Sequence, residues 1–189
     1  MNTAFKEWAL VCEALGCGET SVILRKGGIH EGRDGFRFEH SEFFLFPTQF
    51  HSQTDRLKVP SDTPLPPHVE GEITIRYMAR VEWTKLVTDE TTALALDAFH
   101  PWKKEVVLER FHYDTPAGVH IAFVRVYRLE TPWTFPDASQ YGGCRSWVTL
   151  PEPPSLKLIP VLDDATHRSL EVDLNALLQR TIPPCTVGL

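Results

Sequence analysis

The 189-residue chain lacks several patterns that would identify its chemistry directly. Its four cysteines have no CxxC spacing, so zinc-ribbon and thioredoxin-type motifs are excluded. No run approaches the ~18 apolar residues of a membrane-spanning helix, and the N-terminus has no apolar signal core. We therefore expect a cytoplasmic protein with reduced cysteines and no membrane partner.

Signatures of nucleotide binding and hydrolysis are missing as well. Residues 16–21 resemble the end of a phosphate-binding loop, but Glu19 stands where that loop needs lysine. The GxSxG elbow of esterases is absent, and His30-Glu31 lacks the second histidine of HExxH. Restriction-type nucleases carry an acid or amide two residues before a catalytic lysine, and no lysine here has one. These absences favour a domain that is not an enzyme, although they leave the question open.

The charge balance excludes one broad class of partner. A net charge of −6 argues against a protein that binds polyanions over its whole surface. It does not exclude a local basic patch, because affinity for phosphates depends on where the positive charges lie.

The N-terminal segment has a helical period. Phe5, Trp8 and Cys12 recur at three- and four-residue spacing, which predicts an amphipathic helix over residues 3–15. Gly16 follows directly, as glycine often does at a helix C-terminus.

The rest of the chain predicts strands with helices inserted between them. The apolar and alternating runs predict strands at 20–25, 43–50, 72–83 and 119–129 and a short strand ending at 148, and helices from about 89 to 100, 103 to 111 and 163 to 179. Pro132 and Pro136 predict a loop after the fourth strand. This order favours an α+β fold with a mainly antiparallel, barrel-like sheet. We expect one domain over residues 1–150, followed by an extension over 151–189 with one helix.

Positive and aromatic residues give the leading site hypothesis. Arginine and lysine pair with phosphate, and aromatic faces accept stacked bases. We expect phosphate contacts from Lys26, Arg33, Arg125 and Arg145. Tyr127 and Trp147 are expected to stack on bases, and His51 to make one polar contact. The competing explanation is ordinary cross-strand pairing of the arginines with Glu72, Glu82 and Glu130.

Residues 30–51 also offer an alternative metal site. Glu31, Glu39, His40 and His51 combine imidazole and carboxylate ligands, which suit zinc, iron or manganese. A bound divalent metal would activate water for hydrolysis. The competing explanation is a set of solvated loop charges, and under the leading hypothesis we expect no cofactor.

Several segments together resemble one bacterial family. They are FKEWA at 5–9, LRKGGI at 24–29, FLFPT at 44–48, RVYRL at 125–129 and YGGCRSWV at 141–148. The combination is similar to the family catalogued as domain of unknown function 1802, over about residues 4–150. The family has no established activity, so the resemblance implies no catalytic residue. Similar domains are in some architectures fused to an Mrr-type restriction endonuclease domain, which implies a link to restriction–modification.

Three functions remain open at this point. The first is a nucleic-acid recognition module, reading DNA, RNA or a modified base beside a restriction-type nuclease. The second is the metal-dependent hydrolase, and the third is a protein-interaction domain without chemistry. The first two share one spatial expectation: the Gly27-Gly28 bend lies beside the arginine-bearing strands and lines a common cleft with them.

Overall fold

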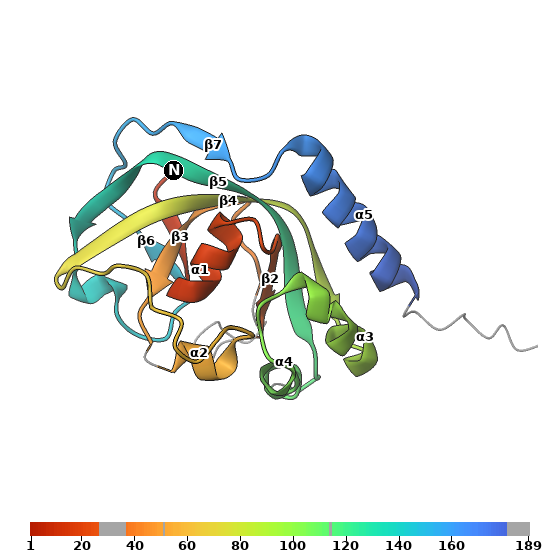
Figure 1. The fold of residues 1–189 in the computed structure, drawn as a ribbon. Coiled ribbons are helices and arrows are strands. Elements are labelled where there is room, and N and C mark those ends of the chain that lie inside the picture. The colour runs from red at the N-terminus through yellow and green to blue at the C-terminus, as the bar shows by residue number, and fades with distance from the viewer. Residues whose placement is uncertain (27–36, 51, 114, 181–189) are drawn as a thin grey trace, which may run out of the picture.

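The computed structural model describes residues 1–26, 37–50, 52–113 and 115–180, and Figure 1 shows their arrangement. The strands are β1 (Thr3–Trp8), β2 (Val22–Arg25), β3 (Glu42–Thr48), β4 (Glu72–Val87), β5 (Val119–Pro136), β6 (Trp147–Thr149) and β7 (Leu158–Pro160). The helices are α1 (Ala9–Gly16), α2 (Gln53–Arg56), α3 (Glu90–Ala95), α4 (Lys104–Phe111) and α5 (Asp164–Arg180), with 3₁₀ turns at Leu96–Phe99 and Ser139–Tyr141. No helix within these described ranges is long and apolar enough to cross a membrane.

The strands form one sheet in the order β2-β5-β4-β3-β1-β6, with β7 added beside β5. Every pairing is antiparallel except that of β1 with β3. In Figure 1 the long strands β4 and β5 arch over α1, and β7 and α5 lie on the opposite side of the arch. The α+β class and the mainly antiparallel sheet are thus confirmed. The sheet does not close into a barrel, because β2 and β6 remain at its two ends.

The predicted helix over residues 3–15 is wrong in its first half. Residues 3–8 are strand β1, which pairs with β3 on one side and β6 on the other. Ala4 and Phe5 are both fully buried, as expected for an interior strand with apolar neighbours on both faces. The three-residue step from Phe5 to Trp8 imitates a helical period, but the sheet pairing overrides it. Only α1 is helical.

The loop predicted from Pro132 is also wrong, because β5 continues to Pro136. The pairing of β5 with β4 is interrupted between Arg128 and Trp133 and resumes beyond. Pro132 lies inside this interruption, so its missing N–H removes no ladder hydrogen bond.

The long strand β4 contributes to both apolar clusters of the core. Ile73 and Ile75 belong to the smaller cluster, whereas Tyr77 and Ala79 belong to the larger one. The pairing with β5 is irregular between them: Ile75 pairs with Trp133 and Tyr77 with Arg128, so the additional residues lie on β5. Such irregularities increase the local twist of a strand pair. The sequence therefore predicts the strand but not its division between two clusters.

The predicted helices after β4 are confirmed. Asp89 caps α3, its carboxylate accepting from the Thr92 backbone N–H at 2.7 Å. Leu174 and Leu178 of α5 are buried in the larger core. The residues after 150 thus pack on the same sheet, through β7 and α5.

Candidate functional site: a basic cleft

A cleft of about 640 Å³ lies where the ends of β1, β2 and β3 meet the end of α4 and the 143–145 loop. We call it the basic cleft. Its cationic lining residues are Lys6, Arg25, Lys26, Arg110 and Arg145; its aromatic ones are Trp8, Phe50 and Tyr113; the others are Thr48, Gln49, Gly143 and Cys144. The described residues that line it include no carboxylate.

Lys6 is held by backbone carbonyls. Its Nζ donates to the oxygens of Tyr141 at 2.7 Å and Gly143 at 2.8 Å. Burial lowers the pKa of Lys6, Cys144 and Asp137 raise it, and the neighbouring charges of Arg145 and Arg25 lower it, with a net lowering. These contacts fix the ammonium group without cancelling its charge.

The hydrogen bonds of Arg25 and Arg110 also go to neutral groups, and the buried carboxylate of Glu7 lies close enough to Arg110 to raise its pKa against the effect of burial. Arg25 donates to Ser146 Oγ at 2.9 Å, and its guanidinium lies 5.2 Å from the ring centre of Phe5. Arg110 donates to the Leu24 carbonyl at 2.8 Å and lies 3.5 Å from the ring centre of Trp102. Burial lowers the pKa of Arg110 to about 10, so it stays protonated at neutral pH.

Two exposed rings give the cleft an apolar wall. Phe50 is 44% exposed and Tyr113 is 41% exposed, although both are large apolar side chains. Phe50 lies against Trp8 with ring centres 5.2 Å apart, and Lys26 Nζ lies 2.8 Å from the ring centre of Tyr113. The cleft therefore combines positive charge with accessible aromatic surface.

The structure brings together only part of the predicted nucleic-acid site. Lys26 and Arg145 line the same cleft. Arg125 lies elsewhere: it donates to Asp164 at 2.6 Å and to the Leu162 carbonyl, and so holds the start of α5. Tyr127 pairs with β7 and lies under the guanidinium of Arg80. The Gly27-Gly28 bend of the spatial expectation lies outside the described residues, so that expectation stays a prediction.

Trp147 is packed rather than open to the cleft. Its ring centre lies 4.9 Å from that of Phe5, 5.1 Å from that of Phe43 and 4.8 Å from that of His40. It packs on Phe5, whose ring centre lies 5.2 Å from the guanidinium of Arg25, and the cleft lining does not include Trp147. Its predicted stacking role stays a prediction.

Part of the predicted set lies outside the described residues. Arg33 of the nucleic-acid hypothesis, Glu31 of the metal hypothesis and His51 of both fall there. Of the remaining metal candidates, Glu39 is exposed and His40 packs on Trp147. Within the described ranges no three His, Cys, Asp or Glu residues come close enough to hold a metal. The metal hypothesis stays a prediction.

Sequence reasoning missed several lining residues. The sequence patterns single out neither Lys6 nor Arg110 nor Tyr113 as a site residue. Lys6 comes to the cleft through the parallel pairing of β1 with β3, which no local pattern predicts. The only available signal was the FKEWA segment itself, which places a lysine between aromatic residues.

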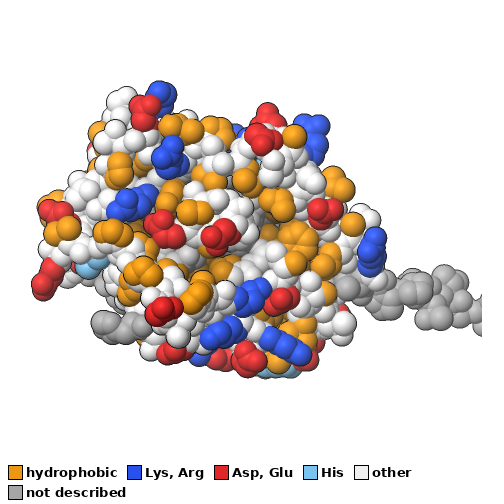
Figure 2. All heavy atoms as spheres, in the orientation of Figure 1, with side chains coloured by type: hydrophobic (Ala, Val, Ile, Leu, Met, Phe, Trp, Pro, Cys, Tyr) orange, Lys and Arg blue, Asp and Glu red, His pale blue; other side chains and the backbone are white. Residues whose placement is uncertain are grey.

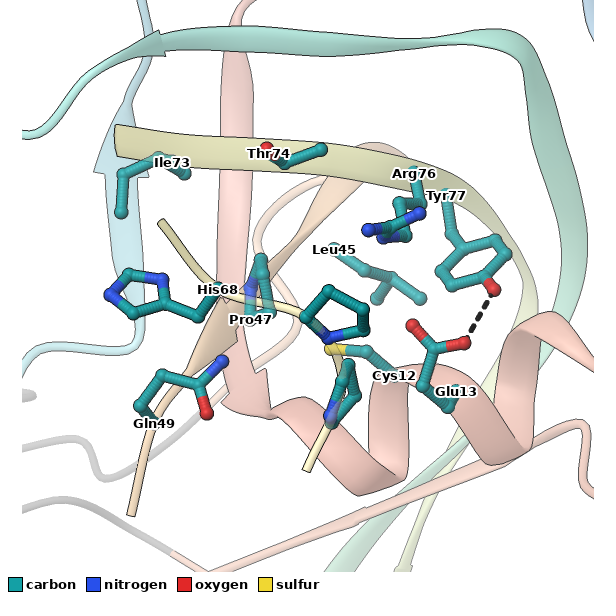
Figure 3. Close-up of a pocket in the computed structure, with 12 residues that line it drawn as sticks. Cys12, Glu13, Leu45, Pro47, Gln49, His68, Ile73, Thr74, Arg76 and Tyr77 are labelled. Atoms are coloured by element: carbon teal, nitrogen blue, oxygen red, sulfur yellow. Dashed lines mark hydrogen bonds between the residues drawn. The ribbon is translucent and has the colours of Figure 1, made fainter. Parts of the chain in front are cut away.

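A second, much smaller pocket lies between β4, α1 and residues 66–68 (Figure 3). Glu13 accepts a hydrogen bond from the Tyr77 hydroxyl at 2.8 Å, and burial raises the pKa of that hydroxyl. This small pocket has a volume of about 20 Å³, which leaves room for a water molecule but not for a substrate.

One face of the molecule carries mixed charge. Figure 2 shows Lys and Arg side chains interspersed with Asp and Glu side chains on that face. This mixture agrees with the net charge of −6.

The model of the family described as domain of unknown function (DUF1802) matches residues 4–172. The chain belongs to the DUF1802 family. The match includes every described residue that lines the basic cleft and extends through β7 into α5. A search of the curated proteins finds no significant match to this DUF1802 chain.

Two solved structures show a distant likeness to the DUF1802 fold. They are crystal structures of ASCH from Zymomonas mobilis and of a mutant of that protein, ZmASCH. Each is 9% identical to this chain, with TM-scores of 0.48 and 0.49. The matches cover 90% and 91% of this chain and 93% and 94% of those chains, respectively.

Proposed function

We propose that this DUF1802 domain is a recognition module that binds nucleic acid in the basic cleft. The observation that carries the proposal is the lining of that cleft by five basic side chains and two exposed rings. Lysine and arginine donors suit phosphate oxygens, and each stacked base contributes ~1–3 kcal/mol on an aromatic face.

The size of the cleft favours an unpaired base. Pockets for small ligands measure roughly 300–1,000 Å³, and the basic cleft falls in that range at about 640 Å³. A single unpaired base, including a modified base, is a ligand of this size. Enzymes that act on single bases either bind single strands or take the base out of the stack.

The proposal includes a restriction-type nuclease as partner. The sequence lacks the acid-or-amide residue before lysine that such nucleases carry. The resemblance to domains that are fused to an Mrr-type endonuclease supports a division of labour, in which this domain recognises and the partner cuts.

Salt dependence tests the proposal directly. Labelled DNA and RNA, single-stranded and duplex, with and without modified bases, are titrated with the protein in 50 and 200 mM salt. Each phosphate neutralised on a single strand changes the slope of log K against log salt by ~0.7. We expect binding that weakens steeply with salt. No binding by any of these probes at 50 mM salt would overturn the proposal.

A further inference from the structure

A second cavity continues from the basic cleft. It measures about 550 Å³ and shares Lys6, Thr48 and Gln49 with the cleft. We call it the adjoining cavity. Its other lining residues are Phe46, Pro47, His68, Gly71, Ile73, Asp137, Ala138, Ser139, Tyr141 and Gly142. The end of β3 is therefore a common wall between two cavities of similar size.

The two cavities differ in chemistry. The adjoining cavity has one described cation, Lys6, at the shared wall, and it contains the exposed carboxylate of Asp137. It also carries the amide of Gln49 and the imidazole of His68, which Figure 3 shows close to each other. A carboxylate repels phosphate, but carboxylates and amides can both recognise the edges of bases. A carboxylate accepts a hydrogen bond from the amino group of cytosine, and a side-chain amide forms two hydrogen bonds with adenine.

We infer that the ligand is single-stranded nucleic acid bound through two consecutive unpaired nucleotides. One nucleotide lies in the basic cleft with its base on Phe50 or Tyr113, and the next lies in the adjoining cavity. Gln49 and Asp137 contact the base edge of the second nucleotide, and Lys6 lies at the shared wall near the phosphate between them. The inference rests on the proposed function and narrows its ligand.

This arrangement excludes a duplex with one extruded base as the preferred ligand. In such a duplex the neighbouring nucleotides remain stacked and paired, so only one cavity can be filled. A flexible single strand fills both at no pairing cost. Aromatic stacking beside a positively charged groove is the general mode of single-strand binding.

The test compares ligands of increasing length. A nucleoside monophosphate, a dinucleotide carrying a 5′-phosphate, a single-stranded 8-mer and its blunt duplex are titrated against the wild type and two variants, Gln49→Ala and Asp137→Ala. Lys85→Ala, an exposed change on β4 outside both cavities, is the matched control. Thermal unfolding checks that each variant is folded; both tested side chains are exposed, so we expect unchanged midpoints.

We expect the dinucleotide to bind at least tenfold more tightly than the monophosphate, and the 8-mer at least tenfold more tightly than its duplex. Gln49→Ala and Asp137→Ala should each weaken dinucleotide binding at least threefold. Asp137 lines only the adjoining cavity, so Asp137→Ala should leave monophosphate binding unchanged. Equal affinity for duplex and single strand, or no gain from the second nucleotide, overturns this inference while the proposed function stands. Absence of binding by every ligand overturns both.

Discussion

The molecule holds its cations in two different ways. In the basic cleft, Lys6, Arg25 and Arg110 donate to carbonyl or hydroxyl oxygens at 2.7–2.9 Å. Elsewhere on the sheet a second set, which we call the paired cations, donates to carboxylates: Arg80 to Glu82, Arg125 to Asp164 and Lys157 to Glu130.

This difference indicates which basic residues remain available to bind an anion such as phosphate. A cation held by a carbonyl is fixed in place but keeps its charge, so an incoming phosphate is attracted without displacing a partner. A cation held by a carboxylate is already neutralised, and phosphate has to compete for it. Counting arginines along strands could not separate the two sets, because their partners come from distant parts of the chain.

The largest expected difference is in nucleic-acid binding, between the cations that line the basic cleft, which also include Lys26 and Arg145, and the paired cations. Replacing Lys26 and Arg145 together by alanine should weaken single-strand binding at least 100-fold at 50 mM salt. The basis is that each hydrogen bond to a charged group contributes ~1.5–3 kcal/mol. The matched control replaces Arg80 and Lys157, and it should change affinity less than threefold. Fluorescence anisotropy measures both, and equal losses would remove the distinction between the two sets.

The next difference concerns stability. Arg110→Met leaves the Leu24 carbonyl without its donor and removes the guanidinium from Trp102. We expect a loss of about 3 kcal/mol in the free energy of unfolding, since buried charged hydrogen bonds are costly to break. Arg125→Met should cost about 1 kcal/mol or less, because its partner Asp164 is 86% exposed.

Urea unfolding measures both variants. If the Arg125 variant proves the less stable of the two, then the paired cation, not the cleft cation, is the structural one.

A buried histidine near Arg110 adds a dependence on pH. Burial lowers the pKa of His100 to about 4, with further lowering by Lys58. The folded state therefore disfavours the protonated form, and stability falls as the pH drops from about 6.5 to about 4. At ~1.4 kcal/mol per pH unit, His100 contributes roughly 2–3 kcal/mol to this fall.

His100→Asn tests that contribution, because the Asn side-chain oxygen can still accept from the Trp102 N–H that now donates to His100 Nδ1. We expect this variant to lose less stability between pH 7 and 4 than the wild type. The pKa of His167, which stacks on Phe123, is lowered first by burial and then by Arg125. His167→Asn should flatten the profile less. Identical profiles for all three proteins would contradict this assignment.

The smallest expected effect belongs to the most exposed pair. Lys157 and Glu130 lie 2.6 Å apart with side chains 71% and 51% exposed. Lys157→Ala should change the free energy of unfolding by less than about 0.5 kcal/mol, as is usual for surface pairs. Urea unfolding in low and high salt gives the value, and a larger, salt-insensitive loss would show that this pair is structural.

The sequence predicted the fold where patterns are local. The alternation over 72–83 predicts β4, and the turn before Trp147 predicts β6. It failed at residues 3–8, because the parallel pairing of β1 with β3 joins segments some 40 residues apart.

The same reasoning explains the outcome for the site. Lys26 and Arg145 stand beside glycines at strand ends, and such positions open onto a cleft here. Arg125 looked equally suitable for a phosphate contact. In the fold, however, it donates to Asp164, which lies 39 residues further along the chain. Arg110 and Tyr113 carry no sequence signal, since only the packing of α4 against β2 brings them to the cleft.

Arginine modification by phenylglyoxal, with and without a saturating single-stranded 8-mer, compares the two regions in one sample. Peptide mass spectrometry then reports which arginines the oligonucleotide protects. The account predicts protection of Arg145 and Arg25, with Arg80 and Arg125 modified equally in both conditions. Protection of Arg80 or Arg125 while Arg145 stays reactive would contradict it.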